Sequence, residues 1–288
     1  MRITILAFII SVCQFANAQE SITLKDIWAS GKFRAQNVYG LRSMNDGLSY
    51  TELINDRGGE KSIRKTSYLD PNEQSIILGS GEMKGVSNPE NGAITFEGYT
   101  FSSNEKKIMI RTGTESIYRH STREWNYIYD LEKKSLDLVS EQKNRYATFS
   151  PKGDQVAFVR DNNVFVTNLN DKSETQLTND GSINEIINGA TDWVYEEEFA
   201  FDKAFFWSPN GKKIAYYKFN EAAVTEFNMP KYGGSLYPKD YKFKYPKAGE
   251  ENSQVMIFIY DLESKKTEMV NVREDYIPRI KWSKSDDF

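Results

Sequence analysis

The chain has 288 residues, of which 39% are hydrophobic and 14% aromatic, and its formal net charge is −4 at pH 7. This composition is that of a globular protein, and it excludes an intrinsically disordered chain. The acidic balance argues against a nucleic-acid-binding protein, which would carry an excess of Lys and Arg.

The first 18 residues have the pattern of a secretory signal peptide. Arg2 is the only charged residue among them, residues 3–15 are almost wholly apolar, and Ala16-Asn17-Ala18 fits a small-residue cleavage site. The alternative is an N-terminal membrane anchor, but an apolar run of about 13 residues is shorter than the ~20 that a spanning helix needs. We therefore expect an exported protein, periplasmic or secreted, with no membrane span after cleavage.

The single cysteine, Cys13, lies inside this segment, so the processed chain would form no disulfide. A lipoprotein anchored through Cys13 is a further alternative, but Val12 before it is larger than the small residue usual at that position. Residues 19–45 have mixed apolar spacing, and this predicts a short helix or an irregular lead-in segment.

From residue 46 to residue 288 the pattern predicts short β-strands. A repeated unit consists of an aromatic residue, Ser, a polar or Gly turn and an alternating apolar strand. It begins at Phe101, Phe149, Trp207 and Trp282, at intervals of 48, 58 and 75 residues. These intervals are typical of the blades of a β-propeller with loop insertions.

The turn chemistry of the repeat supports strands joined by tight hairpins. Pro209 fixes φ at the first corner position, and Gly211 tolerates the positive φ that a sharp reversal needs. We therefore expect an all-β fold, a partial β-propeller of about four blades. Because an open stack of blades would expose a sheet face, we expect the 288 residues to be the N-terminal part of a longer protein.

Residues 192–219 place three consecutive carboxylates, Glu196, Glu197 and Glu198, among aromatic residues. Adjacent like charges repel more strongly as their surroundings lose water, so a cation is needed to keep them ionised. That cation could be an internal Arg or Lys, a metal ion or the ammonium group of a ligand. The alternative is an acidic surface turn beside a core strand.

Residues 228–249 alternate aromatic and polar residues. Tyr241, Phe243 and Tyr245 would lie on one face of an extended strand, and an exposed aromatic face usually binds a partner. Lysines between the rings superficially suggest a single-strand nucleic-acid binder. An exported, acidic protein does not fit that function, so we expect no nucleic-acid partner.

Three ordered stretches carry a resemblance to a known family. They are Tyr118-Arg119-His120-Ser121 with residues 127–131 after it, Asp192-Trp193-Val194-Tyr195-Glu196-Glu197-Glu198 with residues 207–211 after it, and Tyr245-Pro246-Lys247-Ala248-Gly249. In this order they resemble the prolyl dipeptidases of the S9 family, of the dipeptidyl peptidase IV type, over about residues 22–288. The resemblance implies the N-terminal β-propeller portion of a bacterial homologue, with about four of an expected eight blades and without the α/β-hydrolase domain.

The resemblance also implies roles for single residues. Glu197 and Glu198 would hold the ammonium of a peptide's free N-terminus, while Glu196 would support the local structure. Arg119 would bind a substrate backbone carbonyl; the alternative is an ordinary surface ion pair. For His120 we expect a packing or hydrogen-bonding role.

The resemblance further implies a homodimer, with contacts through the arm formed by residues 228–249 and through the hydrolase domain that this chain lacks. The alternative is that this arm folds back over its own propeller.

Serine-peptidase chemistry needs a nucleophile, an imidazole base and an orienting carboxylate. This chain has one histidine, His120, and no GxSxG segment, so we expect the catalytic residues beyond Phe288 and no activity from the 288 residues alone. Candidate metal ligands are equally sparse, so we expect neither a metal site nor a cofactor.

These observations predict the substrate-recognition part of an exported serine exopeptidase. It would release N-terminal dipeptides with Pro or Ala in second position, binding an ammonium whose pKa is about 7.7 to 8.0. Two alternatives stay open, a prolyl tripeptidyl peptidase and a non-catalytic propeller that binds peptides or partners.

Overall fold

Residues 21–35, 40–55, 60–83, 85–90, 94–272 and 274–284 are described by the computed structural model. The expected signal peptide, with Cys13, lies outside these ranges. The chain divides into two units, Met1–Leu41 and Arg42–Phe288. Within the described ranges, no helix is both long enough and apolar enough to cross a bilayer.

The first unit contains the short helix α2 (Leu24–Trp28). Thr23 caps it: the Thr23 hydroxyl accepts a hydrogen bond from the Asp26 N–H at 3.1 Å, and the Asp26 carboxylate accepts one from the Thr23 N–H at 2.9 Å. This reciprocal pair satisfies two backbone donors that would otherwise be free at the start of the helix.

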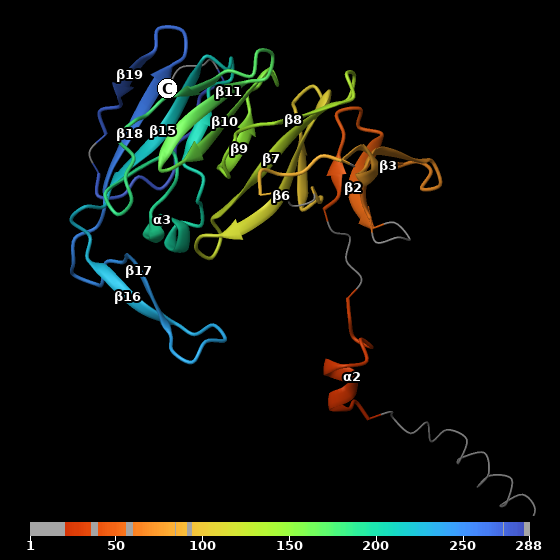
Figure 1. The fold of residues 1–288 in the computed structure, drawn as a ribbon, viewed down its shortest axis with the longest axis horizontal. Coiled ribbons are helices and arrows are strands. Elements are labelled where there is room, and N and C mark those ends of the chain that lie inside the picture. Colours follow the sequence, from red (N-terminus) through yellow and green to blue (C-terminus); the bar gives the residue numbers. More distant parts are fainter. Residues whose placement is uncertain are drawn as a thin grey trace, which may run out of the picture. The chain divides into compact units, whose positions relative to one another are not determined.

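In the described chain, the second unit contains four larger antiparallel sheets, which follow one another along the chain, and one separate two-stranded sheet (Figure 1). The first sheet is formed by β1 (Arg42–Ser43), β2 (Ser49–Asn55), β3 (Lys61–Ser67) and β4 (Gln74–Gly79), with the 3-10 helix η1 (Ser80–Met83) after it. The second sheet is formed by β5 (Gly98–Phe101), β6 (Lys107–Ser116), β7 (Thr122–Asp130) and β8 (Ser135–Leu138). The third sheet is formed by β9 (Arg145–Phe149), β10 (Gln155–Arg160), β11 (Asn163–Asn168) and β12 (Glu174–Gln176).

The fourth sheet has an interrupted edge. Its strands are β13 (Ile186–Asn188), β14 (Phe205–Trp207), β15 (Lys213–Asn220), β18 (Gln254–Asp261) and β19 (Lys266–Met269), and both β13 and β14 pair with β15. The chain between β13 and β14 carries helix α3 (Trp193–Glu198). Between β15 and β18 the chain forms a separate hairpin, the arm, from β16 (Glu226–Lys231) and β17 (Lys239–Lys244).

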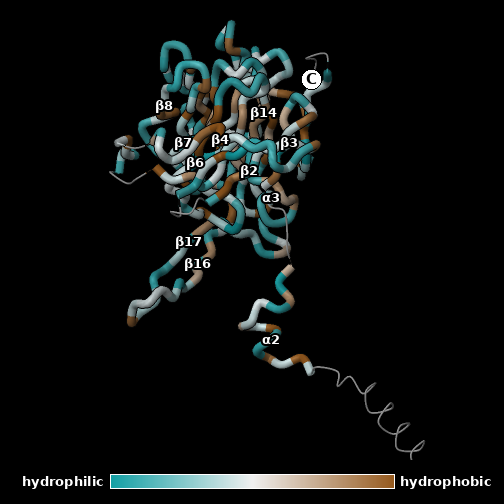
Figure 2. Tube along the Cα trace, turned by 90° about the vertical axis from the view of Figure 1, so that its right-hand side faces the viewer, coloured by the Kyte–Doolittle hydropathy of each residue, from teal (hydrophilic) through white to brown (hydrophobic). Residues whose placement is uncertain are grey.

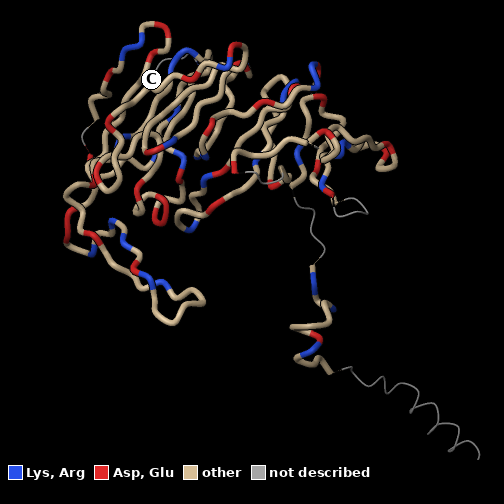
Figure 3. Tube along the Cα trace, viewed as in Figure 1, with Lys and Arg blue, Asp and Glu red and all other residues tan. Residues whose placement is uncertain are grey.

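Alternation along each central strand explains how the sheets pack. Ile108 and Ile110 of β6 share a buried cluster with Ile63 of the first sheet, whereas Met109 between them shares one with Phe158 of the third sheet. Successive side chains of a strand point to opposite faces, so an almost continuous apolar strand buries both faces of its sheet. In Figure 2 the sheets contain many brown, hydrophobic segments, and in Figure 3 many of the charged residues lie at the turns between strands.

The repeated serine has a structural function in three hairpins. The hydroxyls of Ser102, Ser150 and Ser208 accept hydrogen bonds from the backbone N–H five residues later, at 3.0, 3.1 and 2.9 Å. All three serines are buried, so each bond satisfies a donor at the mouth of a hairpin. The prediction of an all-β fold is confirmed, as are the strands predicted after Phe101, Phe149 and Trp207. The fourth repeat, at Trp282, forms no strand within residues 274–284.

Candidate functional site

Helix α3 lies in the segment of chain that leaves the edge of the fourth sheet after β13 and rejoins it before β14. This segment begins at Gly189 and ends at Ala204, and both residues form backbone hydrogen bonds with Tyr217 on β15. The Gly189 N–H donates to the Tyr217 carbonyl, and the Tyr217 N–H donates to the Ala204 carbonyl, each at 2.9 Å. Gly189 has a φ of +74°, and a Cβ there would lie 2.6 Å from Cγ2 of Val164. A glycine is therefore required at position 189, where this segment leaves the sheet.

Capping and aromatic packing fix the helix itself. The Asp192 carboxylate accepts a hydrogen bond from the Tyr195 N–H at 2.9 Å, as an N-cap does. The ring of Tyr195 lies 4.8 Å from those of Phe199 and Phe219, measured between centroids. The aromatic neighbourhood seen in the sequence thus attaches the helix to the fourth sheet.

Glu196 joins this helix to the hairpin loop between β6 and β7, residues 117–121, which we call the arginine loop. Its side chain is 1% exposed, and Oε1 accepts hydrogen bonds from the backbone N–H groups of His120 and Ser121 at 2.7 and 3.0 Å. An acidic surface turn, the alternative considered for the three glutamates, is therefore wrong for Glu196, which has a structural role.

Glu197 forms an ion pair with Arg119 across the same junction. Nε of Arg119 lies 3.1 Å from Oε1 and 3.0 Å from Oε2 of Glu197. The Glu197 side chain is 14% exposed and that of Arg119 is 71% exposed. The contact uses only Nε, so the two terminal nitrogens of Arg119 are free of protein partners within the described chain.

Glu198 differs from both neighbours. It is exposed, and it makes no ion pair or hydrogen bond with the described residues. The three glutamates therefore have three environments: one bonded to backbone, one paired with an internal arginine and one available to an external cation. The residue pattern alone did not distinguish the three, although the resemblance implied that Glu196 supports the local structure while Glu197 and Glu198 bind the ammonium.

His120 is exposed, and within the described chain its imidazole has no hydrogen-bond partner. Its backbone N–H, and not its ring, bonds Glu196 at 2.7 Å. The expected packing or hydrogen-bonding role is therefore wrong for the side chain.

The arm lies against this junction through its aromatic face. Phe243 is 5% exposed, and its ring centroid lies 6.0 Å from that of Tyr118; the centroids of Tyr245 and Trp193 are 4.5 Å apart. The hydroxyl of Tyr241 donates to the Ile117 carbonyl at 3.1 Å. The expectation of an exposed aromatic face is wrong, because these rings pack on the protein's own surface; the alternation predicted their common face but not what that face contacts.

A groove of about 1070 Å³ opens between the arm, helix α3 and the arginine loop. Its walls include Tyr118, Arg119, Trp193, Glu197, Tyr241 and Phe243. An aromatic groove with an arginine–glutamate pair at its wall suits a ligand that has both apolar surface and a charged group.

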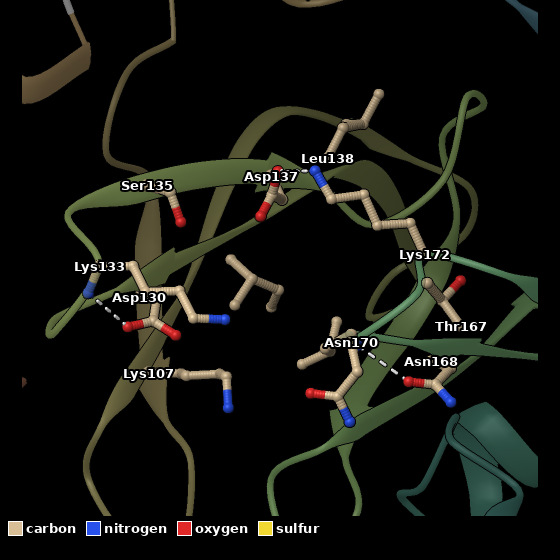
Figure 4. Close-up of a pocket in the computed structure, with 12 residues that line it drawn as sticks. Lys107, Asp130, Lys133, Ser135, Asp137, Leu138, Thr167, Asn168, Asn170 and Lys172 are labelled. Atoms are coloured by element: carbon tan, nitrogen blue, oxygen red, sulfur yellow. Dashed lines mark hydrogen bonds and ion pairs between the residues drawn. The ribbon is translucent and has the colours of Figure 1, made fainter.

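A smaller cavity of about 260 Å³ lies between the second and third sheets (Figure 4). Its polar groups already bond within the protein: Lys172 pairs with Asp137, Lys107 donates to the Gly153 carbonyl at 3.1 Å, and the Asn170 N–H donates to the Asn168 side chain at 2.9 Å. The groove beside Arg119 is therefore the stronger candidate site.

Glu221, at the base of the arm, is a buried acid with an altered pKa. Burial and then the nearby Asp192 carboxylate raise its pKa from 4.5 to about 7, although Lys244 acts in the opposite direction. The folded protein thus keeps the Glu221 proton up to about pH 7, whereas an unfolded chain releases it near 4.5.

Glu221→Gln should therefore stabilise the protein at high pH. Ionisation of Glu221 destabilises the fold progressively from pH 4.5 to pH 7, by up to about 3 kcal/mol above that range. We expect the variant to melt at a higher temperature than the wild type at pH 8 and at the same temperature at pH 4.5. Glu250→Gln, at an exposed position, serves as the control and should show no such difference; equal melting temperatures of Glu221→Gln and wild type at pH 8 would contradict the assignment.

Comparison with known proteins gives consistent matches. The family profile described as "Dipeptidyl peptidase IV (DPP IV) N-terminal region" matches residues 102–288. The chain is 33% identical to a probable dipeptidyl-aminopeptidase B of Tuber melanosporum, over 92% of this chain and 32% of that protein. It is 33% identical to dipeptidyl aminopeptidase B of Saccharomyces cerevisiae, over 84% of this chain and 28% of that protein.

Among solved structures, the chain is similar to dipeptidyl peptidase 4 of Porphyromonas gingivalis. The TM-score is 0.78 and the sequence identity 39%, over 90% of this chain and 37% of that one. The chain thus spans roughly a third of the length of these relatives.

Proposed function

The chain belongs to the dipeptidyl peptidase IV N-terminal region family, and from this we propose that it is the substrate-recognition part of a serine exopeptidase releasing N-terminal dipeptides. Its four sheets are then about four blades of a β-propeller of eight, preceded by the lead-in segment of residues 19–45. The preferred substrates are peptides with Pro or Ala in second position.

The observation that carries this proposal is the charge arrangement around Arg119. Glu197 is paired with Arg119 at 3.0 Å, and Glu198, the next residue of the helix, has no partner within the described chain. Two carboxylates and one guanidinium leave one net negative charge, which suits a single ammonium. Hydrogen bonds to charged groups contribute roughly 1.5 to 3 kcal/mol each.

Arg119 has a second role in this proposal. Its Nε is occupied by Glu197, so its terminal nitrogens donate to a backbone carbonyl of the bound peptide. Binding the carbonyl at Arg119 and the ammonium at the glutamates together fixes how many residues separate the N-terminus from the scissile bond. A peptide with a blocked N-terminus leaves Glu198 without a cation and is rejected.

The chemical step itself is assigned to a hydrolase domain outside these 288 residues. The relatives are about three times as long as the matched region, which leaves room for such a domain. The histidine of this chain, His120, is exposed beside Arg119 and has no role as the general base in this proposal.

Export and assembly complete the proposal. The first 18 residues direct the protein to the periplasm or the exterior and are then removed. The arm forms homodimer contacts through its tip, where Tyr232 and Leu236 are 80% and 90% exposed. Its aromatic face packs against Tyr118 and Trp193 and lines the groove, so this proposal assigns the dimer contacts to the tip.

A substrate panel tests the function. The complete protein should cleave a chromogenic Ala-Pro substrate with a free N-terminus at least ~100-fold more efficiently, by kcat/KM, than the N-acetylated form, because only the former supplies the ammonium. Preference for a tripeptidyl substrate would show the prolyl tripeptidyl alternative to be right. Absence of cleavage, together with a complete gene lacking a GxSxG segment, would leave a non-catalytic propeller that binds peptides or partners.

A further inference from the structure

The arginine loop is a tight turn with external supports on two sides. Within the loop, the Ile117 N–H donates to the Ser121 carbonyl at 2.8 Å, and the Tyr118 N–H donates to the Ser121 hydroxyl at 3.2 Å. Helix α3 supports one side, through Glu196 and the N–H groups of His120 and Ser121.

The arm supports the other side. The Tyr241 hydroxyl donates to the Ile117 carbonyl at 3.1 Å, between residues 124 positions apart in the sequence. The same strand places Phe243 against the ring of Tyr118, with 6.0 Å between centroids. Ile117 and Tyr118 immediately precede Arg119, so the arm contacts the backbone that carries the guanidinium.

We propose that Tyr241 is a positioning residue for Arg119, acting through the Ile117 carbonyl. Helix α3 places Glu197, and the arm together with Glu196 fixes the loop that presents Arg119 to it. The arm thereby becomes part of the substrate site although Tyr241 needs no contact with the peptide. This inference rests on the proposed role of Arg119 in peptide binding.

Tyr241→Phe in the complete protein isolates the hydroxyl. We expect KM for an Ala-Pro substrate to rise about three- to tenfold, the effect of one neutral hydrogen bond, with kcat unchanged within twofold because binding and not chemistry is affected. Tyr237→Phe is the control: it lies on the same arm, is 77% exposed and does not line the groove, and its hydroxyl has no partner within the described chain. An unchanged KM in Tyr241→Phe would overturn the proposal.

A double-mutant cycle tests whether Tyr241 acts through Arg119. In an Arg119→Met background, Tyr241→Phe should change KM by less than about twofold, because the positioned group is gone. If the two effects multiply instead, Tyr241 acts elsewhere and the proposal is wrong.

Hydrogen exchange supplies a readout independent of catalysis. Tyr241→Phe should speed exchange in a peptide covering residues 116–122, and Tyr237→Phe should not. Unaltered exchange in Tyr241→Phe would contradict the positioning role. Because this measurement needs no turnover, it still tests the contact if the complete protein proves not to be a dipeptidyl peptidase, so the two failures can be told apart.

Discussion

Glu197→Gln or Glu198→Gln in the complete enzyme is expected to lower kcat/KM for dipeptidyl substrates by at least ~100-fold, or about 2.7 kcal/mol. Glutamine keeps the shape of the side chain and removes the charge that the peptide ammonium requires. Each variant should bind substrate and transition state less well, because the ammonium is held throughout the reaction.

The same substitutions should leave the melting temperature nearly unchanged. Glu198 is exposed without a partner in the described chain, and the partner of Glu197, Arg119, is 71% exposed. Ion pairs that are open to solvent contribute little to stability, typically 0 to 1 kcal/mol. A large loss of activity without a loss of stability is the expected signature of a recognition residue.

Glu174→Gln is a matched control for an arginine-paired glutamate. Glu174 forms an ion pair with Arg160 at 2.7 Å, on the outer edge of the third sheet. Its substitution should leave kcat/KM within twofold of the wild type. If Glu197→Gln and Glu198→Gln both kept wild-type turnover, the amine-binding assignment would be wrong.

Glu196→Ala should damage both stability and activity. It removes the buried carboxylate that accepts two backbone hydrogen bonds, at 2.7 and 3.0 Å. The N–H groups of His120 and Ser121 then lose this acceptor. We expect a loss of about 2 to 4 kcal/mol in the free energy of unfolding. Activity should fall at least ~10-fold at a temperature where the variant is folded, because the loop carrying Arg119 loses one support.

The comparison of neighbouring residues makes this test specific. Glu198→Ala, on the same helix but exposed, should change the free energy of unfolding by less than about 0.5 kcal/mol. Denaturant unfolding of both variants measures the difference. Equal stability of Glu196→Ala and wild type would show that the buried carboxylate does not hold the arginine loop.

The strands were predictable because their signal is local. Residues 108–110 and 156–159 are apolar on both faces, and the Ser-containing turns before them mark where each hairpin begins. These features depend on neighbours within a few residues, so a single sequence reveals them.

The site was less predictable because its contacts join distant residues. Helix α3 spans only six residues and is stabilised by Tyr195 packing and the Asp192 cap, so propensity alone could not indicate it. The distinct environments of the three glutamates depend on Arg119 and the arginine loop, more than 70 positions earlier. The contact between Tyr241 and Ile117 spans 124 positions, and no pattern in either segment indicates it.

For the arm, the sequence pattern correctly predicted which residues share a face but led to a wrong prediction that this face is exposed. The alternation of Tyr241, Phe243 and Tyr245 correctly placed three rings on one face. It did not show that Tyr118 and Trp193 cover that face. An apolar strand face requires burial, but the sequence does not say whether its own chain or a partner provides it.

The most direct test of the amine receptor compares an Ala-Pro substrate with an analogue in which a methyl group replaces the N-terminal ammonium. Wild-type enzyme should favour the ammonium substrate at least ~100-fold in kcat/KM, and the Glu197→Gln, Glu198→Gln double variant should favour it by only a few-fold. An equally large preference in both enzymes would mean that the ammonium is recognised elsewhere, and the proposed site would be wrong.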